Sequence, residues 1–218
     1  MPEFIPSGLV FDCDGTLADT MPLHWRAWSE LARRHRLEFP ETRFYALGGV
    51  PTRDILRMLS DEQGRPDIDP QALAREKEDL YFQYLPEVGP VEEVVAIARE
   101  HRGRLPMAVA SGGSRHAIRR ILEHLGILGW FEAVVTHEDV TRQKPAPDIF
   151  LEAAARIRVE ASRCRAFEDT DLGMQAILSA GMDAVDVRRM RVGLPAAAMP
   201  GAGGPPWAGA PGPARAGR

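Results

Sequence analysis

The chain has 218 residues, of which 44% are hydrophobic and 27% are charged, and its formal net charge is −4. This length suits one domain, or one domain with a smaller insertion, and the apolar content is too high for a disordered chain. The weak negative charge and the lack of a long basic stretch exclude the usual features of a nucleic-acid binder, so we expect no nucleic-acid partner.

The sequence carries no sign of secretion or of membrane insertion. Its two cysteines, Cys13 and Cys164, lack both the spacing of a zinc site and the density of a disulfide framework. No run of about 18 apolar residues occurs, and the first residues lack the basic start and long apolar stretch of a signal peptide. We therefore expect a cytoplasmic protein without a membrane partner, and a monomer by default.

The first predicted element is a short buried strand over Gly8–Phe11. Its apolar run breaks abruptly into Asp12, Cys13, Asp14 and Gly15, which indicates a strand that ends in a polar loop. This junction is the first candidate for a functional site.

The segment between Thr16 and Leu85 is predicted to be all-helical. Met21–Arg36 carries an amphipathic stripe, with Pro22 in the first turn where a helix tolerates proline. Two more helical stripes follow, made of Ile55, Leu56 and Leu59, and of Leu73, Leu80, Tyr81 and Tyr84.

Beyond Gly89 and Pro90, helices alternate with short apolar runs. The predicted strands are Met107–Ala110, Ala133–Val135, Ala166–Phe167 and Ala184–Val187, and the predicted helices are Val91–His101, Arg115–Leu125, Asp148–Ile157 and Leu172–Ala180. Gly126 and Gly181 stand just past two of these helices as C-terminal caps. The alternation predicts an α/β fold with a Rossmann-like parallel sheet as its core.

The predicted division has three parts. Residues 1–17 and 88–192 form the α/β core, and residues 18–87 form a helical domain inserted into it. Residues 195–218 are rich in proline, glycine and alanine, and we expect this tail to be disordered because it has little apolar surface to bury.

Ligands of open parallel sheets bind beyond the carboxyl ends of the strands, so the residues that follow each strand form the candidate site. They are Asp12, Asp14, Gly15 and Thr16, then Ser111, Gly112 and Gly113, then Lys144, and finally Glu168, Asp169 and Thr170. Together they predict an acidic cup suited to a metal ion, with one lysine. The alternative is a set of solvated loop residues, with Ser111 and Thr170 as caps of the helices that follow them.

The strings VFDCDGTL, AVASGG, QKPAPDIF and FEDTDLG, in this order and spacing, resemble the signature motifs of the haloacid dehalogenase (HAD) superfamily. The resemblance covers about residues 5 to 190. The helical segment is similar to the inserted cap of the branch that contains beta-phosphoglucomutase and small sugar-phosphate phosphatases. Within that branch the chain most resembles phosphatases that act on fructose-1-phosphate or 6-phosphogluconate, which implies a phosphoric monoester hydrolase with a small sugar phosphate as its substrate.

The resemblance implies four catalytic residues. Asp12 would be the nucleophile that forms an aspartyl-phosphate intermediate, and Asp14 would be the general acid and base of the two half-reactions. Ser111 would hydrogen-bond a phosphoryl oxygen, and Lys144 would neutralise the charge shared by Asp12 and the phosphate.

Mg2+ is the expected cofactor, because a carboxylate that attacks a phosphate dianion needs a hard divalent cation to cancel the repulsion. By resemblance its ligands are Asp12, the backbone carbonyl of Asp14 and Asp169. Glu168 would either coordinate the ion or hold the groups that do.

The predicted substrate-binding residues are Gly15, Thr16, His24, Gly49, Ser111 and Gly112. The glycines among them allow backbone amides to approach a ligand closely. His24 is equally well explained as a partly buried helix residue. Trp28 is better explained as core and Arg53 as a solvated helix residue, while Cys13 is expected to be a buried spacer.

The cap loop favours hydrolysis over mutase chemistry. In beta-phosphoglucomutase the equivalent loop carries a lysine and an arginine that hold a second phosphate, whereas this chain has Gly48 at the lysine position and Arg53 displaced by one residue. A phosphosugar mutase remains the alternative. A non-catalytic sugar-phosphate binding protein is a more distant one, because Asp12, Asp14 and Lys144 are all present.

Overall fold

The computed structural model describes residues 4–190, and the predicted disordered tail over 195–218 lies outside them. Within the described part, five parallel strands form one sheet in the order β3-β2-β1-β4-β5. The strands are β1 (Gly8–Phe11), β2 (Met107–Ser111), β3 (Ala133–Thr136), β4 (Cys164–Glu168) and β5 (Asp183–Asp186). The predicted α/β fold class is therefore confirmed.

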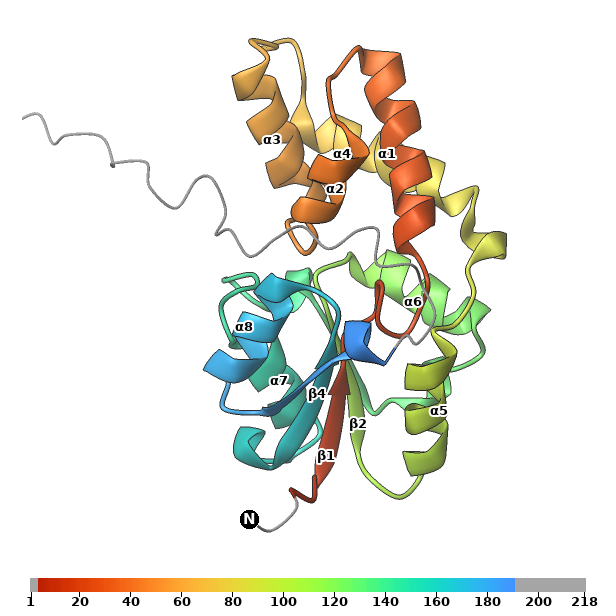
Figure 1. Ribbon diagram of the computed structural model, residues 1–218, viewed down its shortest axis with the longest axis vertical. Coiled ribbons are helices and arrows are strands. Elements are labelled where there is room, and N and C mark those ends of the chain that lie inside the picture. The colour runs from red at the N-terminus through yellow and green to blue at the C-terminus, as the bar shows by residue number, and fades with distance from the viewer. Residues whose placement is uncertain (1–3, 191–218) are drawn as a thin grey trace, which may run out of the picture.

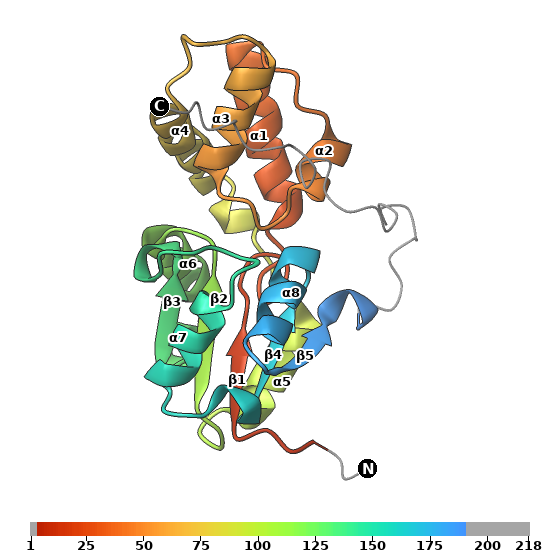
Figure 2. The ribbon, with the colours of Figure 1, turned by 90° about the vertical axis from the view of Figure 1, so that its left-hand side faces the viewer.

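Helices cover both faces of the sheet (Figures 1 and 2). They are α5 (Glu92–His101) and α6 (Arg115–His124) on one face, and α7 (Asp148–Arg156) and α8 (Asp171–Ser179) on the other. Side chains alternate between the faces along a strand. Leu9 and Phe11 accordingly pack with α5 and α6, whereas Val10 packs with α7 and α8.

The register of the sheet sets the position of the candidate site. Phe11, the last residue of β1, pairs with Val109 of β2 and with Phe167 of β4. The three strands therefore end within two residues of one another, and the residues that follow them meet at one edge. Figure 1 places the helical segment above this edge.

That segment comprises α1 (Met21–His35), α2 (Glu41–Ala46), α3 (Thr52–Glu62) and α4 (Pro70–Phe82), and the short 3-10 turn η1 (Leu85–Glu87) follows it. The chain from Thr16 to Leu85 is fully described and adds no strand to the sheet, as predicted.

The two chain segments that connect the helices to the sheet lie side by side. The amide of Asp19 donates to the carbonyl of Gly89 at 2.8 Å, and the amide of Val91 donates to the carbonyl of Leu17 at 3.0 Å. The chain therefore leaves the sheet and returns to it at neighbouring positions.

The last strand lies one residue earlier than predicted, over Asp183–Asp186 instead of Ala184–Val187. Polar residues occupy both of its ends. Asp183 forms an ion pair with Arg165 of β4, and the Asp186 side chain accepts a hydrogen bond from the amide of Arg188. The apolar content of the segment did not reveal these polar contacts.

The two glycine caps are confirmed, since Gly126 and Gly181 have φ of 69° and 74°. Helix α1 instead ends at Arg36, which adopts the left-handed conformation with φ of 54°. Among the helices of residues 4–190, none combines the length and the apolarity that crossing a bilayer requires.

Candidate active site

Asp12, Lys144 and Glu168 form a buried charge cluster at the end of the sheet. Lys144 Nζ lies 2.7 Å from Asp12 Oδ1 and 2.7 Å from Glu168 Oε2. Each of the three residues is less than one-tenth exposed, at 5%, 8% and 1% for Asp12, Lys144 and Glu168. The sheet register brings the two carboxylates together, because the Asp12 amide donates to the carbonyl of Phe167 at 3.0 Å.

The electrostatics of this cluster make the ionised form of Asp12 depend on a nearby cation. Burial raises the pKa of Asp12 well above its usual value and Glu168 raises it further, while Lys144 opposes both. Burial also disfavours the charge of Lys144, but the two carboxylates outweigh it and raise the lysine pKa. Asp12 therefore needs neighbouring positive charge to stay ionised.

Hydrogen bonds to both carboxylate oxygens fix the side chain of Glu168. Its Oε1 accepts hydrogen bonds from the amide of Asp169 at 3.1 Å, and from the amide and hydroxyl of Thr170 at 2.9 and 2.8 Å, while Oε2 accepts from Lys144. Gly173 makes room for this arrangement, because a Cβ there would collide with the Glu168 carboxylate. Glu168 is thus suited to holding the lysine and the loop that carries Asp169.

Oxygen atoms of Asp12, Glu168 and Asp169 lie within 4.8 Å of one another, close enough to share a metal ion. The Thr16 hydroxyl donates to Asp169 Oδ1 at 3.1 Å. Gly15 has φ of 82°, and a Cβ on it would run into the Asp169 carboxylate. A donor set made only of carboxylate oxygens fits a hard cation such as Mg2+.

Asp14 lies beside the cap. Its Oδ1 accepts a hydrogen bond from the hydroxyl of Thr20 at 2.8 Å and lies 3.1 Å from Nε2 of His24. Burial alone would raise the pKa of Asp14, but the contacts with His24 and Thr20 and the charge of Lys77 lower it below its usual value. Asp14 is therefore held as an oriented carboxylate in the ligand-free protein.

Lys77 was not predicted from the sequence as a site residue. It lies on α4, is 7% exposed, and its Nζ is 2.7 Å from Nδ1 of His24. Burial lowers its pKa to about 8. The signal was present in the sequence, because Lys77 is four residues from both Leu73 and Tyr81 and so shares the buried face of its helix.

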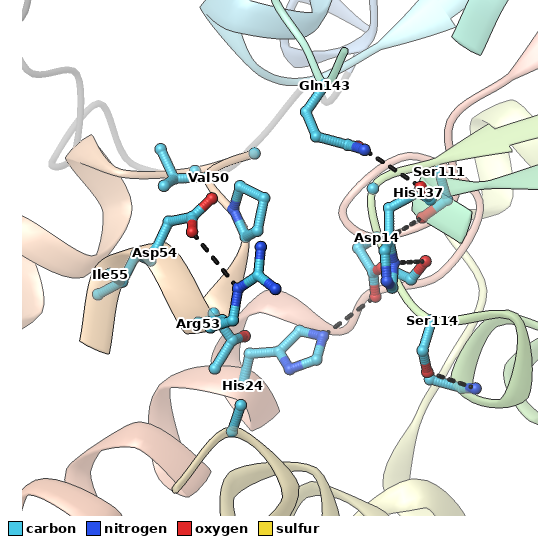
Figure 3. Close-up of a pocket in the computed structure, with 18 of the residues that line it drawn as sticks. Asp14, His24, Val50, Arg53, Asp54, Ile55, Ser111, Ser114, His137 and Gln143 are labelled. Atoms are coloured by element: carbon cyan, nitrogen blue, oxygen red, sulfur yellow. Dashed lines mark hydrogen bonds and ion pairs between the residues drawn. The ribbon is translucent and has the colours of Figure 1, made fainter. Parts of the chain in front are cut away.

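His24 is partly buried on its helix, and its side chain also lines the cavity. Its side chain is 17% exposed and stacks on the ring of Tyr81, with centroids 4.0 Å apart. It also lines the cavity above the sheet, as Figure 3 shows. The histidine is thus a partly buried helix residue that faces the site.

Of the two residues suggested as helix caps, only Thr170 caps a helix in the structure. Ser111 does not cap a helix, because Ser114 fills that role for α6 by accepting from the amide of Ala117, while Ser111 Oγ accepts from the amide of Gly113 at 3.1 Å. Thr170 does cap α8, accepting from the amide of Gly173 at 3.0 Å. The sequence did not show which of the two serines, Ser111 or Ser114, begins α6.

A cavity of about 650 Å³ lies between the sheet edge and the helical segment (Figure 3). The predicted residues Asp12, Asp14, His24, Gly49, Ser111, Gly112, Lys144 and Glu168 line it. Gly49 has φ of 86°, and its carbonyl oxygen would lie 3.9 Å from a Cβ on Gly112. This size is typical of a site for a small ligand.

Three further expectations concern residues outside the charge cluster. Trp28 is 2% exposed and belongs to the apolar core, although part of it lines the cavity. The Arg53 side chain is 56% exposed and lies 3.6 Å from Asp54. Cys13 is fully buried, and burial raises the pKa of its thiol, which disfavours a thiolate nucleophile.

Comparison with known proteins agrees with this geometry. The profile of the family described as haloacid dehalogenase-like hydrolase matches residues 6–181. The fructose-1-phosphate phosphatase YqaB of Escherichia coli (strain K12) is 43% identical over 84% of this chain and 96% of its own length. The beta-phosphoglucomutase of Bacillus subtilis (strain 168) is 32% identical over 82% of each chain.

Among solved structures, a beta-phosphoglucomutase from Clostridium difficile superposes with a TM-score of 0.74 over 84% of each chain, at 24% identity. This likeness bears on the fold. The chain belongs to the haloacid dehalogenase-like hydrolases. The expected enzyme class, a phosphoric monoester hydrolase, is confirmed as well.

Proposed function

We propose that the protein hydrolyses small sugar phosphates of the fructose-1-phosphate type through an aspartyl-phosphate intermediate on Asp12. The observation that carries this proposal is the buried Asp12 carboxylate, 2.7 Å from Lys144 at the closed end of a cavity that also holds Asp14. The 43% identity with a fructose-1-phosphate phosphatase supports the choice of substrate. Residues 18–87 would act as a cap over the core.

Mg2+ is the proposed cofactor. The carboxylates of Asp12 and Asp169 and the backbone carbonyl of Asp14 would hold it, with Glu168 fixing the Asp169 loop and Lys144. When bound, the ion supplies positive charge that offsets the repulsion between the Asp12 carboxylate and the phosphate dianion.

In the first half-reaction, a carboxylate oxygen of Asp12 forms a bond to phosphorus and the bond from phosphorus to the sugar oxygen breaks. Ser111 and Lys144 stabilise the phosphoryl oxygens during this transfer. Asp14 gives a proton to the departing sugar oxygen. The approaching phosphate dianion raises the pKa of Asp14, which is how a carboxylate with a lowered pKa gains the proton that it delivers.

In the second half-reaction, Asp14 is ionised again and takes a proton from the water whose oxygen bonds to phosphorus. The bond between phosphorus and the Asp12 oxygen breaks, which releases phosphate and regenerates the Asp12 carboxylate. The contacts of Asp14 with Thr20 and His24 support this role, because they orient the carboxylate in its ionised form.

A beta-phosphoglucomutase activity is the second candidate, and the 32% identity with such an enzyme favours it. Gly48 argues against it. The backbone there packs tightly, because a Cβ on Gly48 would lie 3.3 Å from the carbonyl oxygen of Tyr45 and 3.4 Å from Thr170 Cγ2. Glycine at this position supplies no cation to hold the second phosphate of a bisphosphate.

The test is phosphate release from fructose-1-phosphate, 6-phosphogluconate, glucose-6-phosphate and beta-glucose-1-phosphate, with and without Mg2+. We expect magnesium-dependent release from the wild type and none from Asp12→Asn, which keeps the shape of the side chain but loses the nucleophile. Release by Asp12→Asn would contradict the mechanism. Conversion of beta-glucose-1-phosphate to glucose-6-phosphate after priming by a bisphosphate, without release, would establish the mutase instead.

A further inference from the structure

Three polar side chains that line the cavity are not hydrogen-bonded to Asp12 or to Asp14. His137 and Gln143 belong to the loop between β3 and α7, and Glu78 belongs to α4 of the helical segment. Figure 3 shows His137 and Gln143 on the Ser111 side of the cavity, across from Arg53. Their remaining hydrogen-bonding capacity determines what they can recognise.

His137 uses one ring nitrogen to hold the loop that follows β2. Its Nδ1 lies 2.8 Å from the carbonyl oxygen of Gly113. A carbonyl oxygen can only accept, so Nδ1 donates, and the tautomer with its single ring proton on Nδ1 presents Nε2 as an acceptor. No residue within 4–190 hydrogen-bonds to this Nε2.

Gln143 is arranged in the same way. Its Nε2 lies 3.1 Å from the carbonyl oxygen of His137 and 3.5 Å from that of Val140, so the donor end of the amide faces the backbone. The amide oxygen is left as an acceptor, and it has no hydrogen-bond partner in the described part of the chain.

Glu78 adds a charged acceptor from the opposite domain. Its Oε1 accepts a hydrogen bond from the Ser114 hydroxyl at 2.5 Å, which ties α4 to the first turn of α6. Its second carboxylate oxygen accepts from no other described residue and is available to a ligand.

We propose that His137, Gln143 and Glu78 form an acceptor wall, which selects phosphate esters whose organic part carries hydroxyl groups and rejects those with a second anionic group. This rests on the proposed function. A hydroxyl can donate to each of these acceptors, whereas a carboxylate or a second phosphate offers only acceptors of its own. The acceptors of the wall would then face other acceptors without a hydrogen-bond donor, and Glu78 would repel the added negative charge.

Three cations of the helical segment line the same cavity and act in the opposite direction, and the buried one, Lys77, already has a partner at 2.7 Å in Nδ1 of His24. Arg53 and Arg75 are both exposed, and Arg53 lies 3.6 Å from Asp54. Exposed charges of this kind contribute little to binding because water screens them. The half-buried acceptors of the wall therefore dominate the choice, which favours fructose-1-phosphate over 6-phosphogluconate.

The first test compares kcat/KM for these two substrates in the wild type and in Glu78→Gln. The substitution keeps an oxygen for Ser114 but removes the charge, so we expect the preference for fructose-1-phosphate to fall by about tenfold. Asp79→Asn is the matched control, since Asp79 is the exposed next residue of α4 and does not line the cavity. The ratio of kcat/KM for the two substrates should be the same in Asp79→Asn as in the wild type.

The second test uses His137→Asn, whose amide can still donate to the carbonyl of Gly113 but offers no acceptor at the Nε2 position. We expect kcat/KM for fructose-1-phosphate to fall about tenfold more than kcat/KM for p-nitrophenyl phosphate, a probe without hydroxyl groups. An equal fall for both would mean that His137 only supports its loop, and would overturn its place in the wall.

The outcomes separate the two proposals. A wild type that prefers 6-phosphogluconate, or a preference unaffected by Glu78→Gln, overturns the acceptor wall while p-nitrophenyl phosphate hydrolysis keeps the phosphatase. Absence of magnesium-dependent release from every substrate, p-nitrophenyl phosphate included, overturns the proposed function and the wall with it.

Discussion

The ammonium group of Lys77 lies 2.7 Å from Nδ1 of His24, and this contact connects the helical segment to the chemistry of Asp14. An ammonium can only donate, so Nδ1 accepts, and the proton of the ring is on Nε2, 3.1 Å from the Asp14 carboxylate. Lys77 therefore selects the form of His24 that donates to Asp14.

Replacing Lys77 by methionine should slow catalysis through Asp14. Without the ammonium, His24 can adopt the other tautomer, which no longer donates to the carboxylate. We expect kcat for a sugar phosphate to fall by about tenfold to a hundredfold, within the range that acid–base groups contribute. Hydrolysis of p-nitrophenyl phosphate should fall less, because its leaving group needs less help from an acid. Equal losses for both substrates would contradict a role through Asp14.

We also expect Lys77→Met to change how the unfolding free energy depends on pH. The pKa of Lys77 is lowered from 10.5 to about 8 in the folded protein, so between these values the unfolded chain binds more protons at this residue than the folded one. The unfolding free energy of the wild type should therefore rise with pH across this window relative to Lys77→Met, by up to about 3 kcal/mol. Urea unfolding of both proteins at pH values on either side of the window measures the difference. A constant difference would show that the lysine is charged throughout.

Lys144→Met should leave two buried carboxylates facing each other without their shared cation. We expect a loss of about 3 to 5 kcal/mol of stability, the usual cost of removing one partner from a buried ion pair. If the carboxylate cluster binds Mg2+, adding the ion should recover part of that loss. Thermal or urea unfolding with and without Mg2+ checks both points, and a variant as stable as the wild type would count against the cluster.

Gly173→Ala should disturb Glu168 without replacing any charged residue. A Cβ at position 173 would collide with the Glu168 carboxylate, so that side chain must move away from Lys144. We expect a loss of about 1 to 3 kcal/mol, larger than the gain from the better helix propensity of alanine, together with lower activity. Gly129→Ala is the control, because nothing lies within 4 Å of its Cβ position. Similar unfolding midpoints for the two variants would argue against the clash.

The carboxylate cluster could be predicted from the sequence because it depends on strand ends alone. Once Gly8–Phe11 and the β4 segment are parallel neighbours, Asp12 and Glu168 must meet at the same edge. Each strand end carries a short motif of its own, so these motifs were sufficient to predict which residues lie together there.

The cap side of the site could not be predicted in the same way. Lys77 and Glu78 reach the cavity because α4 packs against α1 and over the sheet, and helix packing leaves no short motif in the sequence. His137 and Gln143 lie in a loop whose path is set by contacts with the carbonyls of Gly113 and Val140, which no residue pattern encodes. The sequence likewise left open whether Ser111 caps the helix that follows it, because that depends on the path of the loop after β2.

The paired crossings at Asp19–Gly89 and Leu17–Val91 mean that the chain leaves the sheet core and returns to it at nearly the same point. The core would keep both of its ends in place if a different stretch of chain joined them there. The helical segment and the sheet core are therefore encoded in separable pieces of the sequence, and the segment can change through mutation, exchange or insertion while the core stays fixed.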